Sequence, residues 1–87
     1  MVKKTVTWNS TSNFHMRPAG TFSNEMGRFS SSIQLTYEGV RADGKSMMNL
    51  MAASIPAQAK LEVECAGSDE TEAMARAEQL LELELGE

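Results

Sequence analysis

The amino-acid sequence predicts an α+β fold, an open-faced β-sandwich in which three helices cover one face of a four-stranded antiparallel sheet. Three observations support this prediction. Four short segments alternate in polarity with the period of a strand, three segments have apolar residues at helical spacing, and their order along the chain is βαββαβα. A length of 87 residues is typical of one domain, so we expect residues 1–87 to fold as a single unit.

A polar loop separates the first strand from the first helix. Residues 2–8 alternate in polarity, and the even positions of this strand are expected to face inward. After the loop at residues 9–13, a helix is predicted from about Met16 to Gly27, because Pro18 is tolerated in a first turn and nowhere deeper. Its interior contains several weak helix formers, so packing against the domain must stabilise it. The apolar positions of this helix are Ala19, Phe22 and Met26.

A hairpin and a short helix follow. The alternation over residues 33–37 predicts the second strand, and Glu38-Gly39 is expected to turn the chain into a short third strand over residues 40–42. Ser46 is placed to cap a helix over residues 47–53. A helix this short is not stable alone, so it must lie on the domain.

The last strand and the last helix complete the predicted fold. Residues 60–65 alternate and form the fourth strand. The segment 67–69 opens the last helix, in which Asp69 and Glu72 have the spacing of a capping box. The buried stripe of this helix is expected at Ala73, Met74, Ala77, Leu80 and Leu81.

Composition and charge exclude several classes of protein. Eight basic and twelve acidic residues give a formal net charge of −4, which disfavours DNA or RNA as the main partner. One cysteine, Cys65, excludes an internal disulfide, and with one histidine it excludes a Cys/His zinc site, so we expect no metal and no cofactor. Cys65 itself fits a small buried apolar residue. No apolar run approaches the roughly 20 residues of a membrane span, and residues 1–5 lack a signal peptide's apolar segment, so we expect a cytoplasmic protein.

The single histidine, His15, stands immediately before the first predicted helix. Free backbone N–H groups at a helix N-terminus attract anions, and Arg17 adds a forked donor within reach of the same anion. A neutral imidazole there can attack a phosphorus atom, and those donors can hold the phosphoryl group. Taken alone, a histidine before a helix is more often a plain cap or a solvated surface residue.

Three motifs in register extend this interpretation. Residues 15–19 read His-Met-Arg-Pro-Ala and resemble the active-site signature of the histidine-containing phosphocarrier family, HPr, of bacterial sugar phosphotransferase systems, which is usually His-Ala-Arg-Pro-Ala. Residues 45–51 resemble the family's second signature, Lys-Ser followed by an apolar helix, and residues 67–70 resemble the opening of its last helix. Length and element order also match, so the resemblance covers essentially the whole chain.

The resemblance implies a function for His15. It would accept a phosphoryl group from enzyme I, itself charged by phosphoenolpyruvate, and pass it to sugar-specific IIA components for sugar uptake. The group would be carried on the ring nitrogen facing the helix N-terminus, the pros position, with Arg17 as electrostatic partner. Ser12 is expected either to add a hydroxyl hydrogen bond or to stabilise the loop. We therefore expect a monomeric, stoichiometric carrier rather than an independent enzyme.

Ser46 has two compatible interpretations. As an N-cap it contributes about 1 kcal/mol to stability. In the Gram-positive branch of the family, the matching serine is phosphorylated by HPr kinase/phosphorylase, and a phosphate here would place about two negative charges beside the partner surface.

A methionine-rich patch is the predicted partner surface. Met47, Met48 and Met51 occupy a helix too short to bury all its faces, so we interpret them as a partly exposed patch near the histidine rather than as core. Met16, which replaces the family's small residue, and Gly20 are assigned to the same surface.

Other functions remain to be distinguished from the carrier. Asn24 and Glu25 stand in stretches where the family commonly has lysines, and Asn13, Phe14 and Ser54 also depart from its pattern. These departures leave open a regulatory HPr paralogue that acts as an interaction module through Ser46 and the methionines rather than in sugar transport. An unrelated sheet domain that binds a peptide or small anion would require three coincidental motifs. A hydrolase is disfavoured because His15 has no placed carboxylate partner.

Overall fold

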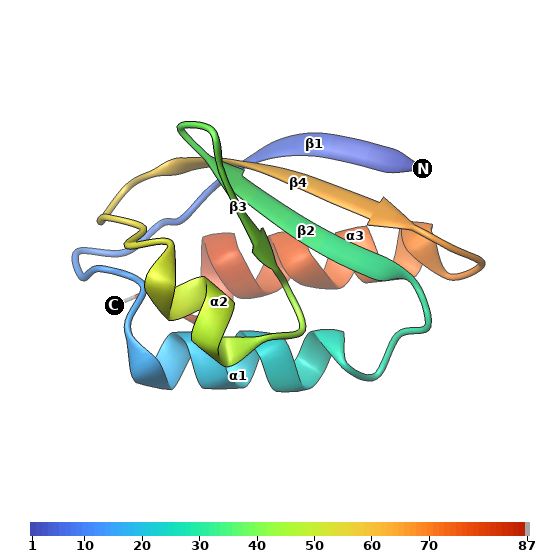
Figure 1. The fold of residues 1–87 in the computed structure, drawn as a ribbon, viewed down its shortest axis with the longest axis horizontal. Helices are drawn as coiled ribbons and strands as arrows, with labels where there is room; N and C mark the ends of the chain where they lie inside the picture. The colour runs from blue at the N-terminus through green and yellow to red at the C-terminus, as the bar shows by residue number, and fades with distance from the viewer. Residues whose placement is uncertain (87) are drawn as a thin grey trace.

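The computed structural model describes residues 1–86 and has the predicted order of strands and helices (Figure 1). The helices end slightly earlier than expected, because Gly27 and Ala53 serve as C-caps rather than as helical residues. A π-helical turn, η1, was not predicted. The elements are β1 (Val2–Thr7), α1 (Met16–Met26), β2 (Ser32–Tyr37), β3 (Val40–Asp43), α2 (Met47–Ala52), β4 (Lys60–Ala66), α3 (Glu70–Gln79) and η1 (Leu80–Glu84).

The strands form one antiparallel sheet in the order β1-β4-β2-β3. The central strands β4 and β2 place Val63 opposite Leu35, both buried. Glu38 and Gly39 connect β2 to β3 with positive φ angles of 47° and 84°. Two successive residues of positive φ match the right-handed twist of a hairpin, so the predicted turn is confirmed.

The core lies between this sheet and the helices. Figure 1 shows α1 and α3 side by side beneath the sheet, with the short α2 next to α1. The predicted apolar residues of α1 are fully buried, and the predicted stripe of the last helix is buried from α3 through η1. Lys4 is exposed, against the prediction that the even positions of β1 face inward, because β1 is an edge strand; the Lys4 ammonium lies 3.0 Å from Glu78 of α3. The predicted open-faced sandwich is confirmed.

The capping box at the start of α3 was predicted wrongly. Asp69 occupies the N-cap position but makes no side-chain capping bond. Its carboxylate instead accepts hydrogen bonds from the backbone N–H groups of Ser30 and Ser31, both at 2.9 Å, and from the Ser31 hydroxyl. These bonds, the Ser31 hydroxyl foremost, lower the pKa of Asp69 to about 2. The carboxylate thus joins the loop before α3 to the loop after α1.

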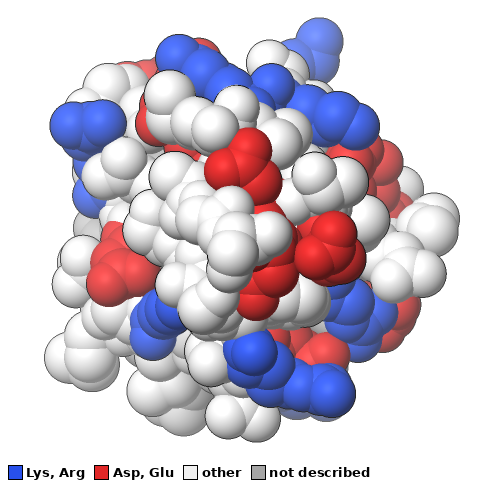
Figure 2. All heavy atoms as spheres, turned by 90° about the vertical axis from the view of Figure 1, so that its right-hand side faces the viewer, with Lys and Arg blue, Asp and Glu red and all other residues white. Residues whose placement is uncertain are grey.

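The end of the molecule where these two loops lie carries charges of both signs. Figure 2 shows acidic side chains across the middle of this face and Lys and Arg side chains along its upper and lower parts. Among the described residues of this face, positive charge is divided by negative charge. Such a surface lacks the continuous basic patch that binds a nucleic-acid backbone.

Candidate functional site

His15 is the N-cap residue of α1 and is exposed. Its backbone is extended, with φ −98° and ψ −165°, and its carbonyl accepts the N–H of Ala19 at 3.0 Å. Its side chain makes no capping hydrogen bond to the helix. The imidazole therefore stands at the positive end of the α1 dipole without occupying the first amides of the helix.

Packing of the preceding residue holds this exposed histidine in place. The ring of Phe14 is buried and stacks on Trp8 with centroids 4.8 Å apart, and it meets the edge of Phe22 at 6.0 Å. The Phe14 N–H donates to the carbonyl of Ile55 at 2.9 Å. Both the side chain and the backbone before His15 are thus attached to the core.

Hydrogen bonds order the loop between β1 and α1. The indole N–H of Trp8 donates to the carbonyl of Ser12 at 2.8 Å, and the Ser12 N–H donates to the hydroxyl of Ser10 at 3.0 Å. Asn9 donates to two carbonyls of η1, to Leu81 from its backbone at 3.1 Å and to Glu82 from its side chain at 3.2 Å. Both backbone groups of Ser12 therefore stabilise the loop.

Arg17 lies in the first turn of α1, is exposed, and lines a small hollow of about 230 Å³. Pro18 and Thr21 form one side of this hollow, and Glu84 and Leu85 contribute to the other. The guanidinium is thus carried on the same helical turn that begins at His15, beside the C-terminal part of the described chain.

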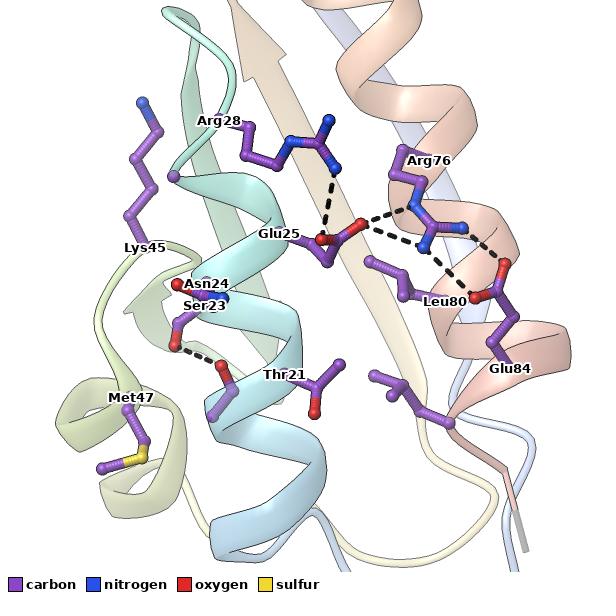
Figure 3. Close-up of a pocket in the computed structure, with 13 residues that line it drawn as sticks. Thr21, Ser23, Asn24, Glu25, Arg28, Lys45, Met47, Arg76, Leu80 and Glu84 are labelled. Carbon is purple, nitrogen blue, oxygen red and sulfur yellow. Dashed lines mark hydrogen bonds and ion pairs between the residues drawn. The ribbon is translucent and has the colours of Figure 1, made fainter.

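A broad open groove of about 1090 Å³ runs along α1 between α2 and α3 (Figure 3). On the α2 side, the Sδ atom of Met47 lies 3.4 Å from the position that a Cβ would occupy on Gly20. A Cβ at Gly20 would thus make ordinary van der Waals contact with the Met47 side chain, so α1 and α2 lie close together at this point. Figure 3 shows Met47 on one side of α1 and the charged groups Glu25, Arg76 and Glu84 on the other.

The methionines of the predicted partner surface differ in exposure. Met16 is 62% exposed and Met48 is 72% exposed, whereas Met47 is 36% exposed. Met51 is half-buried and packs against the core. Met16 and Gly20 are one helical turn apart, so Met16 lies on the side of α1 that meets Met47.

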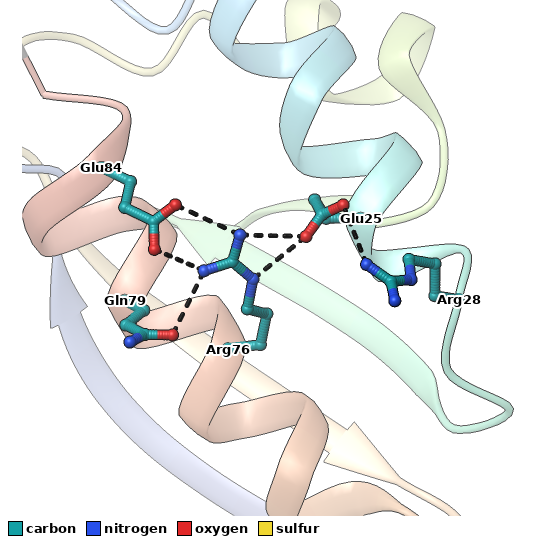
Figure 4. A network of polar contacts seen from close by, with 5 residues as sticks. All are labelled: Glu25, Arg28, Arg76, Gln79 and Glu84. Carbon is teal, nitrogen blue, oxygen red and sulfur yellow. Dashed lines mark hydrogen bonds and ion pairs between the residues drawn. The ribbon is translucent and has the colours of Figure 1, made fainter.

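An ion-pair network ties α1 to α3 and η1 (Figure 4). The guanidinium of Arg76 donates to Glu25 at 3.1 Å and makes a two-pronged contact with Glu84, while Arg28 lies 3.5 Å from Glu25. The hydrogen bond from Arg76 is the main reason that the pKa of Glu25 is lowered. Acidic groups therefore balance both arginines beside the groove, and the network holds α1 against α3.

The hydroxyl of Ser46 caps α2, as predicted. It accepts the N–H of Asn49 at 3.2 Å, and Ser46 is half-buried. The neighbouring Lys45 donates from Nζ to the carbonyl of Phe29 at 2.7 Å. Lys45 therefore connects the start of α2 to the loop after α1.

The described part of the chain contains neither a membrane-spanning helix nor a cluster of metal ligands. Among residues 1–86, no helix combines the length and the apolar character needed to cross a bilayer. Within the same residues, no group of three or more His, Cys, Asp or Glu side chains is arranged to hold a metal ion.

Several residues of this site had no signal in the sequence. Phe14 was noted only as a departure from the family pattern, and its stacking on Trp8 joins two chain segments whose contact depends on the loop. Arg76 and Gln58 belonged to no motif, because their partners lie about 50 positions away, at Glu25 and Ser10. An acidic residue in the last turn of α1 and a basic one in α3 are the available hint to the ion-pair network.

Comparison with known proteins decides the family. The protein-family model described as the PTS HPr component phosphorylation site matches residues 2–82 of the chain. The chain belongs to the HPr family. The motif-based resemblance is thereby confirmed, and HPr is the phosphocarrier of the phosphotransferase system.

Related sequences and a solved HPr structure are similar to this protein over most or all of its length. The phosphocarrier protein HPr of Treponema pallidum is 34% identical over 82 residues, which cover 94% of this chain and 93% of that protein. The HPr-like protein Crh of Halalkalibacterium halodurans is 35% identical over 74 residues, covering 85% and 88%. The crystal structure of HPr-C-His from Thermoanaerobacter tengcongensis superposes with a TM-score of 0.92 at 28% identity, covering 100% of this chain and 98% of that one.

Proposed function

We propose that this protein accepts a phosphoryl group on His15 from phosphorylated enzyme I and passes it to IIA components for sugar uptake in the cytoplasm. The observation that carries the proposal is the exposed imidazole of His15 at an uncapped helix N-terminus, within an HPr-family chain. Phosphoenolpyruvate is the original donor, through enzyme I. The protein acts as a monomeric carrier, with one phosphoryl group per cycle, and uses no cofactor.

The transfer is an in-line exchange at phosphorus. The lone pair of His15 Nδ1 forms the N–P bond, while the bond between phosphorus and its donor atom on enzyme I breaks and leaves its electron pair on the donor. The first backbone N–H groups of α1 then donate to the phosphoryl oxygens. Arg17, two residues along the same turn, supplies the neighbouring positive charge. Ser12 contributes by ordering the loop and, in the phosphorylated form, through its hydroxyl.

The docking surface for enzyme I and the IIA components is formed by Met16, Gly20, Met47, Met48 and Met51. Exposed thioether side chains adapt to several partners, which suits a carrier that must bind a donor and several acceptors in turn. Gly20 lies beside Met47 where α1 and α2 meet. The charges beside it are locally paired, so association with enzyme I depends on apolar contact more than on electrostatic steering.

Ser46 is the proposed regulatory site, modified by HPr kinase/phosphorylase. A phosphate on this residue would replace the hydroxyl oxygen as the cap of α2 and would be stabilised there by the helix end. The fold would survive, while the added negative charge beside Met47 would weaken docking of the partners.

The deciding experiment is intact-mass analysis after incubation with phosphoenolpyruvate and enzyme I. One acid-labile phosphoryl adduct is expected on the wild-type protein and none on the His15→Ala variant, whose folding is checked by circular dichroism. Labelling of the alanine variant would show that His15 is not the acceptor.

The second candidate is a regulatory HPr paralogue, an interaction module that works through Ser46 and the methionine surface. The local pairing of Arg28 and Arg76 with acidic groups favours it, because it leaves less positive charge to attract enzyme I. An unlabelled but folded wild-type protein, beside a labelled known phosphocarrier, would make this candidate the leading one.

A further inference from the structure

Gln58 has an unusual backbone and an unusual side-chain contact. It lies between α2 and β4 with φ at +60°, in the left-handed region that favours glycine. Its side-chain amide donates from Nε2 to the carbonyl of Ser10 at 2.8 Å. Glycine would adopt this backbone conformation more readily but has no side-chain amide to donate. The side chain at this position thus makes a contact that the turn itself does not require.

The acceptor of this bond, Ser10, belongs to the loop between β1 and His15. Ser10 is only 1% exposed, donates its N–H to the carbonyl of Trp8 at 3.0 Å and accepts the N–H of Ser12 on its hydroxyl at 3.0 Å. Trp8 in turn bonds the carbonyl of Ser12 and stacks on Phe14. The side-chain amide of Gln58 attaches these contacts to the connection between α2 and β4, beside the backbone bonds from Trp8 to Ala59 and from Phe14 to Ile55.

We propose that Gln58 is a positioning residue for phosphoryl transfer. By holding the Ser10 carbonyl, it orders the loop that carries the imidazole of His15 relative to the first amides of α1. This inference rests on the proposed carrier function. Small displacements of a nucleophile have large kinetic consequences, so loss of this hydrogen bond should slow transfer about ten-fold.

Three variants test the proposal. Gln58→Gly removes the amide and relieves the backbone, and Gln58→Glu keeps the size of the side chain but replaces the donor by an acceptor. Ser54→Gly is the matched control, because Ser54 lies in the same connection and also has a positive φ, 54°. It relieves the same kind of backbone strain without removing the bond to Ser10.

Two measurements are made on each folded variant: the rate of His15 phosphorylation by enzyme I and the hydrogen exchange of the Ser12 amide. For both Gln58 variants we expect kcat to fall about ten-fold with KM for the carrier unchanged, together with faster exchange at Ser12. Ser54→Gly should match the wild type in both measurements, and Gln58→Gly should unfold at no lower temperature than Gln58→Glu.

Each outcome is decisive. Wild-type transfer rates in the two Gln58 variants would overturn the proposal, as would equal slowing by Ser54→Gly, which would assign the effect to the backbone of this connection. A wild-type protein that takes no label defeats the proposed carrier function instead. In that event, unchanged exchange at Ser12 in the Gln58 variants would separately overturn the ordering of the loop by Gln58.

Discussion

The helices α1 and α2 begin in opposite ways. At α2, the hydroxyl of Ser46 accepts the N–H of Asn49, so the first turn is closed by the chain's own side chain. At α1, His15 occupies the same N-cap position with an extended backbone, and its side chain makes no such bond. In α1, Pro18 stands at the position of Asn49 and has no N–H, so a capping side chain would occupy the Arg17 amide that an anion needs. The α2 terminus is therefore built for stability, whereas the α1 terminus leaves its amides for a ligand.

The α1 terminus is stabilised by other means. Phe14, directly before His15, is buried between Trp8 and Phe22, and its N–H bonds the carbonyl of Ile55. Packing of the neighbouring residue replaces the missing cap. A polar terminus can thus remain available for chemistry when an adjacent aromatic ring attaches it to the core.

The largest expected effect, a complete loss of phosphoryl transfer, comes from giving α1 a side-chain cap. In His15→Asp, the carboxylate should cap the helix by accepting the N–H of Arg17, since Pro18 has none, and raise the free energy of unfolding by about 1 kcal/mol, while phosphoryl transfer is lost completely. Urea denaturation and intact-mass analysis measure the two effects. His15→Ala is the control, with the same loss of labelling but no gain in stability. If His15→Asp were less stable than the wild type, the comparison of the two termini would be wrong.

Removing the packing that supports α1 should have the next largest effect. Phe14→Ala leaves a cavity beside Trp8 and should lower the free energy of unfolding by about 3–5 kcal/mol. Phe14→Leu retains most of the apolar contact and should lower it by about 1–2 kcal/mol. Both values come from urea denaturation. A loss under about 1 kcal/mol in Phe14→Ala would mean that the ring does not support the helix terminus.

Removing the cap of α2 tests whether the Ser46 side chain contributes to stability rather than to phosphoryl transfer. Ser46→Ala should lower the free energy of unfolding by about 1 kcal/mol and leave phosphorylation of His15 unchanged. Ser46→Asp retains a capping oxygen, so its stability should match the wild type, while its negative charge should slow phosphorylation by enzyme I. Equal transfer rates in the two variants would show that charge at this position does not affect docking.

The smallest effect concerns α3, whose N-cap carboxylate bonds a different segment of the chain. The bonds from Ser30 and Ser31 lower the pKa of Asp69 to about 2, from about 3.9 in an unfolded chain. The stability that these bonds supply is therefore present above about pH 4 and is lost as the pH falls toward about 2. Thermal unfolding between pH 7 and pH 2.5 should show a shallower acid dependence for Asp69→Asn than for the wild type. Parallel curves would contradict this assignment.

Prediction from the sequence succeeded for features that depend on the residues of one short segment alone. The alternation of residues 33–37 and 60–65, the turn at Glu38-Gly39 and the cap at Ser46 are local features, and each is present in the structure. The motif at residues 15–19 likewise indicated a family that the comparison confirms. The capping box failed because Asp69 had a second set of donors 38 residues away, at Ser31, which no local pattern reveals.

The sequence by itself thus determined the order of the strands and α-helices, most of their inward-facing residues and the helix terminus that carries His15. These follow from the periods of strands and helices and from the conformational preferences of single residues. Only the tertiary structure decided how that terminus is held, through the stacking of Phe14 on Trp8 and the bond from Gln58 to Ser10. The physical reason is that loop conformation depends on contacts between distant segments, which exist only after the sheet and helices have packed.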